Sequence, residues 1–190
     1  PARLARQGRR GIRGRTPPGL SSAPDSGGKH KGKYRALTGG GTRSAEGLAT
    51  GLDHLKELGV THVHLLPSFD FGSIDESRLQ DGVYDWGYDP KNYFVPEGSY
   101  ATDPYDPAVR IREFKQMVRS LHRNGIRVVM DAVYNHTHRT EESNFSLTVP
   151  GYYYRHEADG SFSDATGCGN ETASERAMMR RLIVDAVCYW

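Results

Sequence analysis

Apolar residues in the first half of the chain follow a helical spacing and then an extended one. Leucines recur every three or four positions through residues 48–58, which predicts a helix with a single apolar face. Thr50 and Asp53 have the spacing of a capping box at its start, and Gly59 marks its end. The next run, residues 60–66, is short and rich in valine and leucine, so it predicts a strand.

The same order of helix and strand returns further along the chain. Asp106 followed by Pro107 is typical of a helix start, and apolar residues then recur at helical spacing until Gly125. Residues 126–130 form a second short apolar run, which predicts a buried strand. A strand, a helix and a strand in this order form a crossover unit with parallel strands, so the sequence predicts an α/β fold.

Two long connections, residues 68–106 and 137–171, separate or follow these elements. Loops of this length are uncommon inside compact domains, and they usually carry function. A third helix is expected over residues 172–190, because Thr172 and Glu175 have the spacing of a second capping box. Its expected inward residues are Met178, Leu182 and Ala186.

Candidate functional residues lie at the end of the second predicted strand and in the first long loop. The strand is followed by Asp131, Asn135 and His136, and ligands of parallel sheets lie beyond the carboxyl ends of the strands. The loop segment 84–90 (YDWGYDP) places aromatic rings beside carboxylates, a combination that suits a sugar. The simpler alternatives are polar side chains that satisfy nearby backbone groups, and aromatic residues that pack against their own loop.

Composition narrows the class of partner. The formal net charge is +2, but residues 1–15 carry six arginines and no acid, so the rest of the chain has 19 basic residues against 23 acidic ones. This mildly acidic body gives no reason to expect a nucleic acid partner, and no apolar run is long enough to predict a membrane span. Two cysteines are too few for a disulfide framework. Residues 1–28, rich in Arg, Gly and Pro, are expected to be a disordered tail.

Five segments together carry a resemblance to type I pullulanases, which are glycoside hydrolases of the α-amylase superfamily. The fourth segment differs from the family signature YNWGYDP only by Asp85 in place of Asn. The fifth segment is close to the region-one motif shared across the superfamily, and all five occur in the family's order over about residues 29–190. The segments are 30–34 (HKGKY), 51–59 (GLDHLKELG), 63–67 (VHLLP), 84–90 (YDWGYDP) and 131–136 (DAVYNH).

The resemblance implies that residues 29–190 are the N-terminal part of a catalytic (β/α)8 TIM barrel, truncated before strand four. Residues 60–67 would be strand two, residues 126–133 strand three, and residues 172–190 the helix that leads to strand four. Residues 1–28 depart from the family, because they lack the run expected for the first barrel strand. The implied function is the hydrolysis, with retention of configuration, of α-1,6-glucosidic bonds in pullulan, starch or glycogen-type α-glucans.

Transferred residue by residue, the resemblance implies a substrate-binding set and no catalytic group. The family's nucleophile, its acid/base and its transition-state stabiliser would all follow Trp190, so the chain by itself is expected to be inactive. No cofactor is implied as a requirement, and calcium is the one candidate, with Asn135 as its ligand. The residues implied to bind the sugar at the cleaved bond are Tyr88, which stacks on it, Asp89 and His136, which hydrogen-bond it, Asp131, which orients the site, and Trp86.

Two other functions stay open at this point. His62 and His64, like His136 and His138, have the H-x-H spacing of two imidazoles on one side of a strand, which would suit a metal-dependent hydrolase. The simpler interpretation is that one of these pairs faces the helix layer. A non-catalytic carbohydrate-binding module is the second alternative, because the binding residues lie within the chain and the catalytic ones do not. The sequence indicates no cellular compartment.

Overall fold

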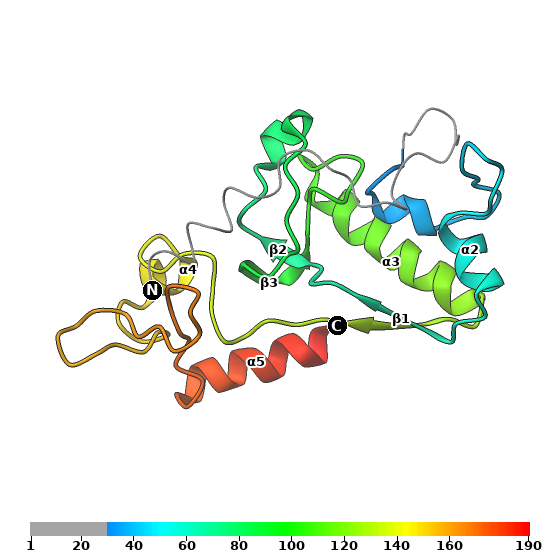
Figure 1. The fold of residues 1–190 in the computed structure, drawn as a ribbon. Helices are drawn as coiled ribbons and strands as arrows, with labels where there is room; N and C mark the ends of the chain where they lie inside the picture. The colour runs from blue at the N-terminus through cyan, green and yellow to red at the C-terminus, as the bar shows by residue number, and fades with distance from the viewer. Residues whose placement is uncertain (1–29) are drawn as a thin grey trace.

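The computed structural model describes residues 30–190, so the tail expected at residues 1–28 lies outside the described residues. The described chain folds around two separate pairs of strands with helices beside them (Figure 1). None of its described helices is both long and apolar enough to cross a membrane. The elements in chain order are η1 (Tyr34–Leu37), α2 (Gly51–Glu57), β1 (His62–Leu65), β2 (Phe69–Phe71), η2 (Glu76–Asp81), β3 (Pro90–Pro96), α3 (Pro107–Arg123), β4 (Arg127–Met130), α4 (Asn144–Thr148) and α5 (Ala177–Tyr189).

Strands β1 and β4 pair in parallel, which confirms the expected crossover unit. Val63 lies opposite Val128, and α3 connects the two strands along the chain. One face of the pair packs against η1, α2 and α3, where apolar side chains form the main core. Within residues 30–190 these two strands do not close into a barrel. The buried members of this core are Tyr34, Leu52, Phe114, Met117, Leu121 and Ile126.

The opposite face of the parallel pair is exposed. Along β1 the side chains of His62 and His64 are exposed, while those between them are partly buried against the helices. The interpretation that this histidine pair faces the helix layer is therefore wrong. The reason is the two-residue period of a strand, which gives the helix side to the valine and leucine of β1 and the open side to both histidines.

Helix α3 begins and ends where its local signals place it. The Asp106 carboxylate accepts a hydrogen bond from the Ala108 amide at 2.9 Å, and Pro107 occupies the first helical position. The chain leaves the helix through Gly125, whose φ of 75° lies in the left-handed region that favours glycine. The helix thus holds the position of β4 relative to the core.

Removal of the α3 cap is expected to weaken the fold measurably. Asp106→Ala leaves the first amides of the helix without their side-chain acceptor, so the free energy of unfolding should fall by about 1 kcal/mol. Asp106→Ser keeps a capping oxygen and is the matched control, which should stay close to the unchanged chain. Denaturant melts monitored by circular dichroism measure both variants. Equal losses for the two variants would contradict the capping role.

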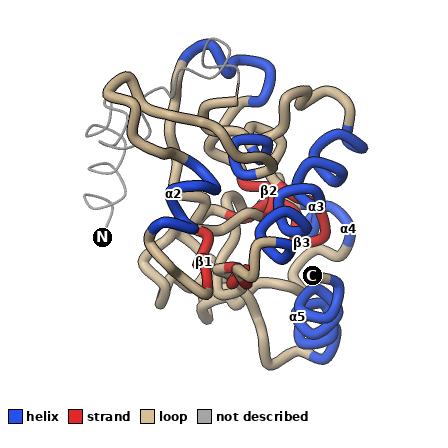
Figure 2. The backbone as a smooth tube through the Cα atoms, turned by 90° about the vertical axis from the view of Figure 1, so that its right-hand side faces the viewer, coloured by secondary structure: helices blue, strands red, loops and turns tan. Residues whose placement is uncertain are grey.

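The composition of residues 68–106 predicts a long loop. The structure instead has β2, η2 and β3 within this segment. β2 and β3 pair antiparallel, with a shift in register on either side of Asp70. All three residues of β2 are buried, including this aspartate, so the strand lacks the polar and apolar alternation that would reveal it. Figure 2 shows how much of the remaining chain between the labelled helices and strands is loop.

Helix α2 begins at Gly51 with Thr50 as its N-cap residue, as predicted, and Leu48 lies before it. Thr50 makes no side-chain capping bond, and the Asp53 carboxylate instead accepts the Gly41 amide at 2.5 Å. The predicted capping box is therefore wrong, because Asp53 holds the preceding loop rather than the helix start. Leu48 and Leu58 are both exposed, which leaves Leu52 as the buried residue of this helix.

Helix α5 begins later than expected. The Thr172 hydroxyl is buried and donates to the Tyr134 carbonyl at 2.6 Å, and Glu175 pairs with Arg155. Both residues of the predicted capping box are thus engaged by other parts of the chain, and that prediction is wrong. The buried residues of the helix are Met179 and Ala186; Leu182 packs beside them, and Met178 is exposed.

Candidate functional site

The carboxyl ends of β1 and β4 lie side by side and position the first candidate residue. Leu65 and Met130 are opposite each other at the two strand ends. Asp131 follows directly, and its amide donates to the Leu65 carbonyl at 3.1 Å. This last rung of the ladder fixes the Asp131 backbone, so its carboxylate stands at the edge where parallel sheets bind ligands.

Tyr88 meets Asp131 across 43 positions of sequence. The Tyr88 hydroxyl donates to Asp131 Oδ2 at 2.7 Å, which joins the first long loop to the end of β4. This bond raises the pKa of the Tyr88 hydroxyl above its ordinary value, because the neighbouring carboxylate disfavours the phenolate. The tyrosine is 39% exposed, so its ring remains open to a ligand. The two residues expected at one site are therefore in contact.

The turn that presents Tyr88 depends on Gly87. Its φ is +85°, and a Cβ at this position would come within 2.7 Å of the Pro67 carbonyl oxygen, which nothing but glycine tolerates. The Gly87 amide also donates to Asp85 Oδ1 at 2.6 Å. Trp86 precedes the glycine and is 56% exposed, so the turn carries two aromatic side chains on the surface.

His136 hydrogen-bonds to the backbone of Tyr88. Its Nε2 donates to the Tyr88 carbonyl at 2.6 Å, and its Nδ1 lies 3.0 Å from Asn135 Oδ1. The ring is only 7% exposed. The structure thus brings His136 to the site, where it holds the tyrosine backbone.

Asp89 also lies at the site with its carboxylate turned inward. Asp89 Oδ2 accepts from the Ser73 hydroxyl and lies 2.8 Å from His138 Nδ1. The close approach of His138 requires Gly72, because a Cβ there would lie 2.2 Å from the imidazole ring. These contacts tie the start of β3 to the segments on either side of it.

One neighbour of the site was not among the residues that the sequence indicates as substrate-binding. His64 Nε2 lies 3.8 Å from Asp131 Oδ2, and its side chain is 65% exposed. The signal that could have found it is its place one residue before the end of β1, on the face opposite the apolar residues. His64 therefore belongs to the same surface as Tyr88 and Asp131.

Asn135, the expected calcium ligand, lies next to His136 at the site. Its side-chain oxygen lies beside the imidazole of His136, and its carbonyl accepts the Thr172 amide at 3.0 Å. Calcium takes six to eight oxygen ligands, among which asparagine and backbone carbonyls are common. The calcium role of Asn135 stays a prediction.

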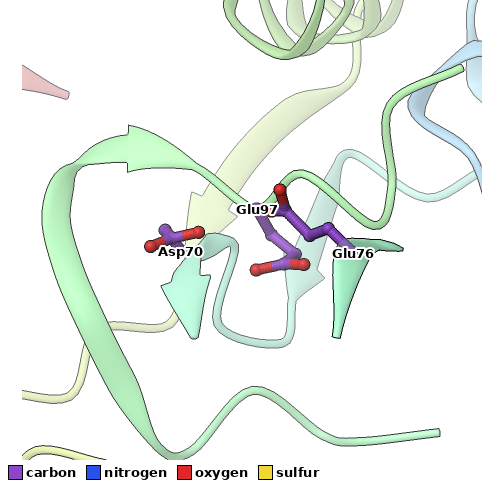
Figure 3. Close-up of side chains that lie close together, drawn as sticks. All are labelled: Asp70, Glu76 and Glu97. Carbon is purple, nitrogen blue, oxygen red and sulfur yellow. The ribbon is translucent and has the colours of Figure 1, made fainter. Parts of the chain in front are cut away.

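Asp70, Glu76 and Glu97 do form such a group, with ligand atoms within 4.8 Å of one another (Figure 3). Their cation is a side chain of the same protein. Arg110 Nη1 lies 3.2 Å from Asp70 Oδ1, and Arg110 Nη2 lies 2.5 Å from Glu76 Oε2. Glu97 accepts the amides of Phe71 and Ser99. The guanidinium is thus the positive charge that pairs with Asp70 and Glu76 within the protein.

The histidine pairs give the metal-dependent alternative no support. His136 and His138 bond to different partners, a backbone carbonyl and a carboxylate. Neither they nor His62 and His64 belong to the one group of potential metal ligands in residues 30–190. A catalytic zinc site needs three protein ligands around one ion, and these imidazoles supply no such arrangement.

Comparison with known proteins agrees with this geometry. Residues 31–155 match the family described as alpha amylase, catalytic domain. The chain is 52% identical over 166 residues to the pullulanase of Bacillus subtilis strain 168, which covers 87% of this chain and 23% of that protein. It is 40% identical over 177 residues to chloroplastic pullulanase 1 of Arabidopsis thaliana, covering 75% of this chain and 18% of that one.

Solved structures show the same similarity in three dimensions. The pullulanase of Paenibacillus barengoltzii, in complex with maltohexaose and alpha-cyclodextrin, superposes with a TM-score of 0.85 at 54% identity, covering 90% of this chain and 27% of that one. The type I pullulanase of Bacillus subtilis strain 168, complexed with maltose, superposes with a TM-score of 0.80 at 52% sequence identity. The match covers 85% of this chain and 22% of that one.

The chain thus spans about a quarter of the length of these relatives. The match confirms the expected fold class, a part of a (β/α)8 barrel in which β1 and β4 are parallel strands. The chain belongs to the alpha-amylase family.

Proposed function

We propose that this chain is the substrate-binding part of a debranching glycoside hydrolase that cleaves α-1,6-glucosidic bonds, with retention, in pullulan, starch or glycogen-type α-glucans. The observation that carries the proposal is the hydrogen bond between Tyr88 and Asp131. It fixes an exposed aromatic ring beside a carboxylate at the carboxyl end of a parallel strand pair, in a chain whose relatives are pullulanases.

This surface has the chemistry that a glucose unit requires. The ring of Tyr88 offers an apolar face to the C–H groups of a sugar, and Trp86 adds a second aromatic side chain from the same turn. Asp131 keeps acceptor capacity after it binds the tyrosine, because a carboxylate accepts about four hydrogen bonds. His64 adds a polar group on the neighbouring strand.

His136 and Asp89 differ from Tyr88 and Asp131 because their side chains bond within the protein. In the chain without a ligand their polar atoms bond to Tyr88, Ser73 and His138. A sugar hydroxyl reaches the His136 ring only in exchange for one of its internal bonds, whereas Asp89 Oδ1 is buried and has no internal bond to give up. Both residues therefore hold the Tyr88 turn in the free chain and offer hydrogen bonds to the sugar once it is bound.

Cleavage requires groups that the described site does not supply. A retaining glycosidase uses two carboxyl groups about 5–5.5 Å apart, one as nucleophile and one as acid and base. The resemblance places neither of them within this sequence, so the 190-residue chain alone is expected to release no reducing sugar from pullulan. Release above a control without protein would contradict this assignment.

The proposed activity is tested by restoring the rest of the enzyme. Residues 30–190 would replace the matching segment of the Bacillus subtilis pullulanase, to which the chain is 52% identical over 166 residues. The resulting chimera is expected to hydrolyse pullulan, and the Asp131→Asn chimera is expected to lose most of this activity. A folded chimera that hydrolyses α-1,4-linked amylose and leaves pullulan intact would contradict the proposal.

A further inference from the structure

One oxygen of the Asp89 carboxylate has no hydrogen-bond donor. Asp89 Oδ2 is satisfied by Ser73 and His138, whereas Asp89 Oδ1 is buried and lacks any partner that carries a hydrogen. An unpaired buried carboxylate oxygen costs free energy, because it has given up water and gained nothing in return. The atom therefore requires a donor from its surroundings.

The neighbouring imidazole does not supply this donor. His138 Nδ1 lies 2.8 Å from Asp89 Oδ2, and His138 Nε2 accepts a hydrogen bond from Arg139 Nε at 3.3 Å, so both ring nitrogens are engaged away from Asp89 Oδ1. Neither Asp85 nor Asp89 forms an ion pair with a lysine or arginine among the described residues. The Arg139 guanidinium is itself paired with Glu142 at 2.7 Å.

Asp85 is the side chain within hydrogen-bonding reach of Asp89 that remains. Its own Oδ1 accepts the Gly87 amide at 2.6 Å across the tight turn. Burial raises the pKa of the Asp85 carboxyl, whereas the hydrogen bond from the Gly87 amide lowers it. The charge of Asp89 and the hydrogen bond to it raise this pKa, the charge of His138 lowers it, and the net direction is upward. Tyr100 is the other titratable group that faces Asp85.

We propose that Asp85 and Asp89 share one proton, and that this makes Asp85 a positioning residue for the turn that presents Tyr88. The protonated Asp85 donates to Asp89 Oδ1, which supplies the missing donor and leaves the pair with a single negative charge. Two ionised carboxylates at this distance would repel each other and open the turn. The family signature that residues 84–90 resemble has an asparagine at this position, whose amide donates without a proton to lose.

The consequence is a dependence on pH that asparagine would not give. The folded chain holds the proton of Asp85 more tightly than the unfolded chain does, because the pKa is raised. This stabilisation is complete below the ordinary pKa of aspartate and is lost as the pH rises through the raised value. The turn should therefore loosen toward higher pH.

The pair is tested without a ligand, by carbon-detected NMR of side-chain carboxyls in the 190-residue chain over a pH titration. Asp85 is expected to titrate at higher pH than Asp81, which lies in the same loop, is exposed and pairs with Arg78. Asp89→Asn removes the shared charge, so the Asp85 titration should move back toward that of Asp81. Titration of Asp85 together with Asp81 in the unchanged chain would overturn the proposal.

Asp85→Asn tests the positioning role, and Asp81→Asn is its matched control. The fluorescence of Trp86 and the affinity for maltotriose are expected to change with pH in the unchanged chain and in Asp81→Asn, and to stay flat in Asp85→Asn. We expect the loss of affinity at high pH to be about tenfold, the effect of one charge-assisted hydrogen bond. The affinity measurement rests on the proposed function, whereas the NMR titration does not. A shared proton with a pH-independent Trp86 signal would overturn the positioning role alone.

Discussion

Tyr88→Ala in the chimeric pullulanase is expected to lower kcat/KM for pullulan by about 100-fold. The change removes a ring that would stack on the sugar, about 1.5–3 kcal/mol of buried apolar surface. It also removes the Tyr88 hydroxyl, which donates to Asp131 Oδ2 at 2.7 Å. This charge-assisted hydrogen bond contributes a free energy of about the same size, about 1.5–3 kcal/mol. The lower end of the two contributions, about 3 kcal/mol together, corresponds to this loss in rate.

Tyr84 provides the matched control for this measurement. It lies in the same turn and is 40% exposed, close to the 39% of Tyr88, yet it makes no hydrogen bond to Asp131. Tyr84→Ala should leave kcat/KM within about twofold, as is usual for a surface change that removes less than 0.5 kcal/mol. Tyr88→Phe keeps the ring and should lose only about tenfold. Equal losses for Tyr84→Ala and Tyr88→Ala would remove Tyr88 from the site.

Arg110→Ala is expected to be the most destabilising change in the chain, at about 3–5 kcal/mol. Arg110 is buried and binds Asp70 at 3.2 Å, Glu76 at 2.5 Å and the Pro104 carbonyl at 3.0 Å. Its removal leaves buried carboxylates without their cation. Because Asp70 belongs to β2, the β2–β3 pair that leads into the Tyr88 turn should open first.

The control for this variant is Arg181→Ala. Arg181 pairs with Asp185 on the exposed surface of α5, where an ion pair contributes less than about 1 kcal/mol. Denaturant melts of both variants measure the difference, and hydrogen exchange of the β2 and β3 amides locates it. An Arg110→Ala chain as stable as Arg181→Ala would contradict the structural role of the cluster.

The same cluster predicts the direction of a pH effect. Burial raises the pKa of the Glu97 carboxyl to about 6, above its ordinary value of 4.5, so the folded chain is stabilised at low pH and loses that contribution as the pH rises toward 6. Without Arg110 nearby, the pKa of Glu97 should rise further. The deficit of Arg110→Ala should therefore shrink as the pH falls below about 6, which the same melts would detect.

The sequence predicts those parts of the fold whose signals are local. Asp106, Pro107 and Gly125 define α3 by neighbouring contacts alone, and the parallel pairing of β1 with β4 follows from the order of elements. The elements that it misses depend on distant partners. β2 carries an aspartate in a buried strand because Arg110, 40 positions away, neutralises it. The predicted start of α5 failed for the same reason, since Thr172 bonds to the distant Tyr134 carbonyl.

The site shows the same division. The position of Asp131 follows from the end of an apolar run, and the resemblance supplies Tyr88 as its companion. The contact between them could not be predicted, because it joins residues 43 positions apart through the geometry of a glycine turn. His64 could have been found from its strand position, since a residue one step before a strand end on the open face lies next to whatever follows the neighbouring strand.

The surface around Tyr88 and Asp131 is expected to bind an α-glucan. An NMR titration of the isotope-labelled 190-residue chain with maltotriose tests it most directly, because each residue reports its own surroundings. The signals of Trp86, Tyr88, Asp131 and His136 are expected to shift with one binding curve, and Asp131→Asn is expected to weaken this binding. Shifts confined to other parts of the chain, with these four signals unchanged at saturating maltotriose, would contradict it.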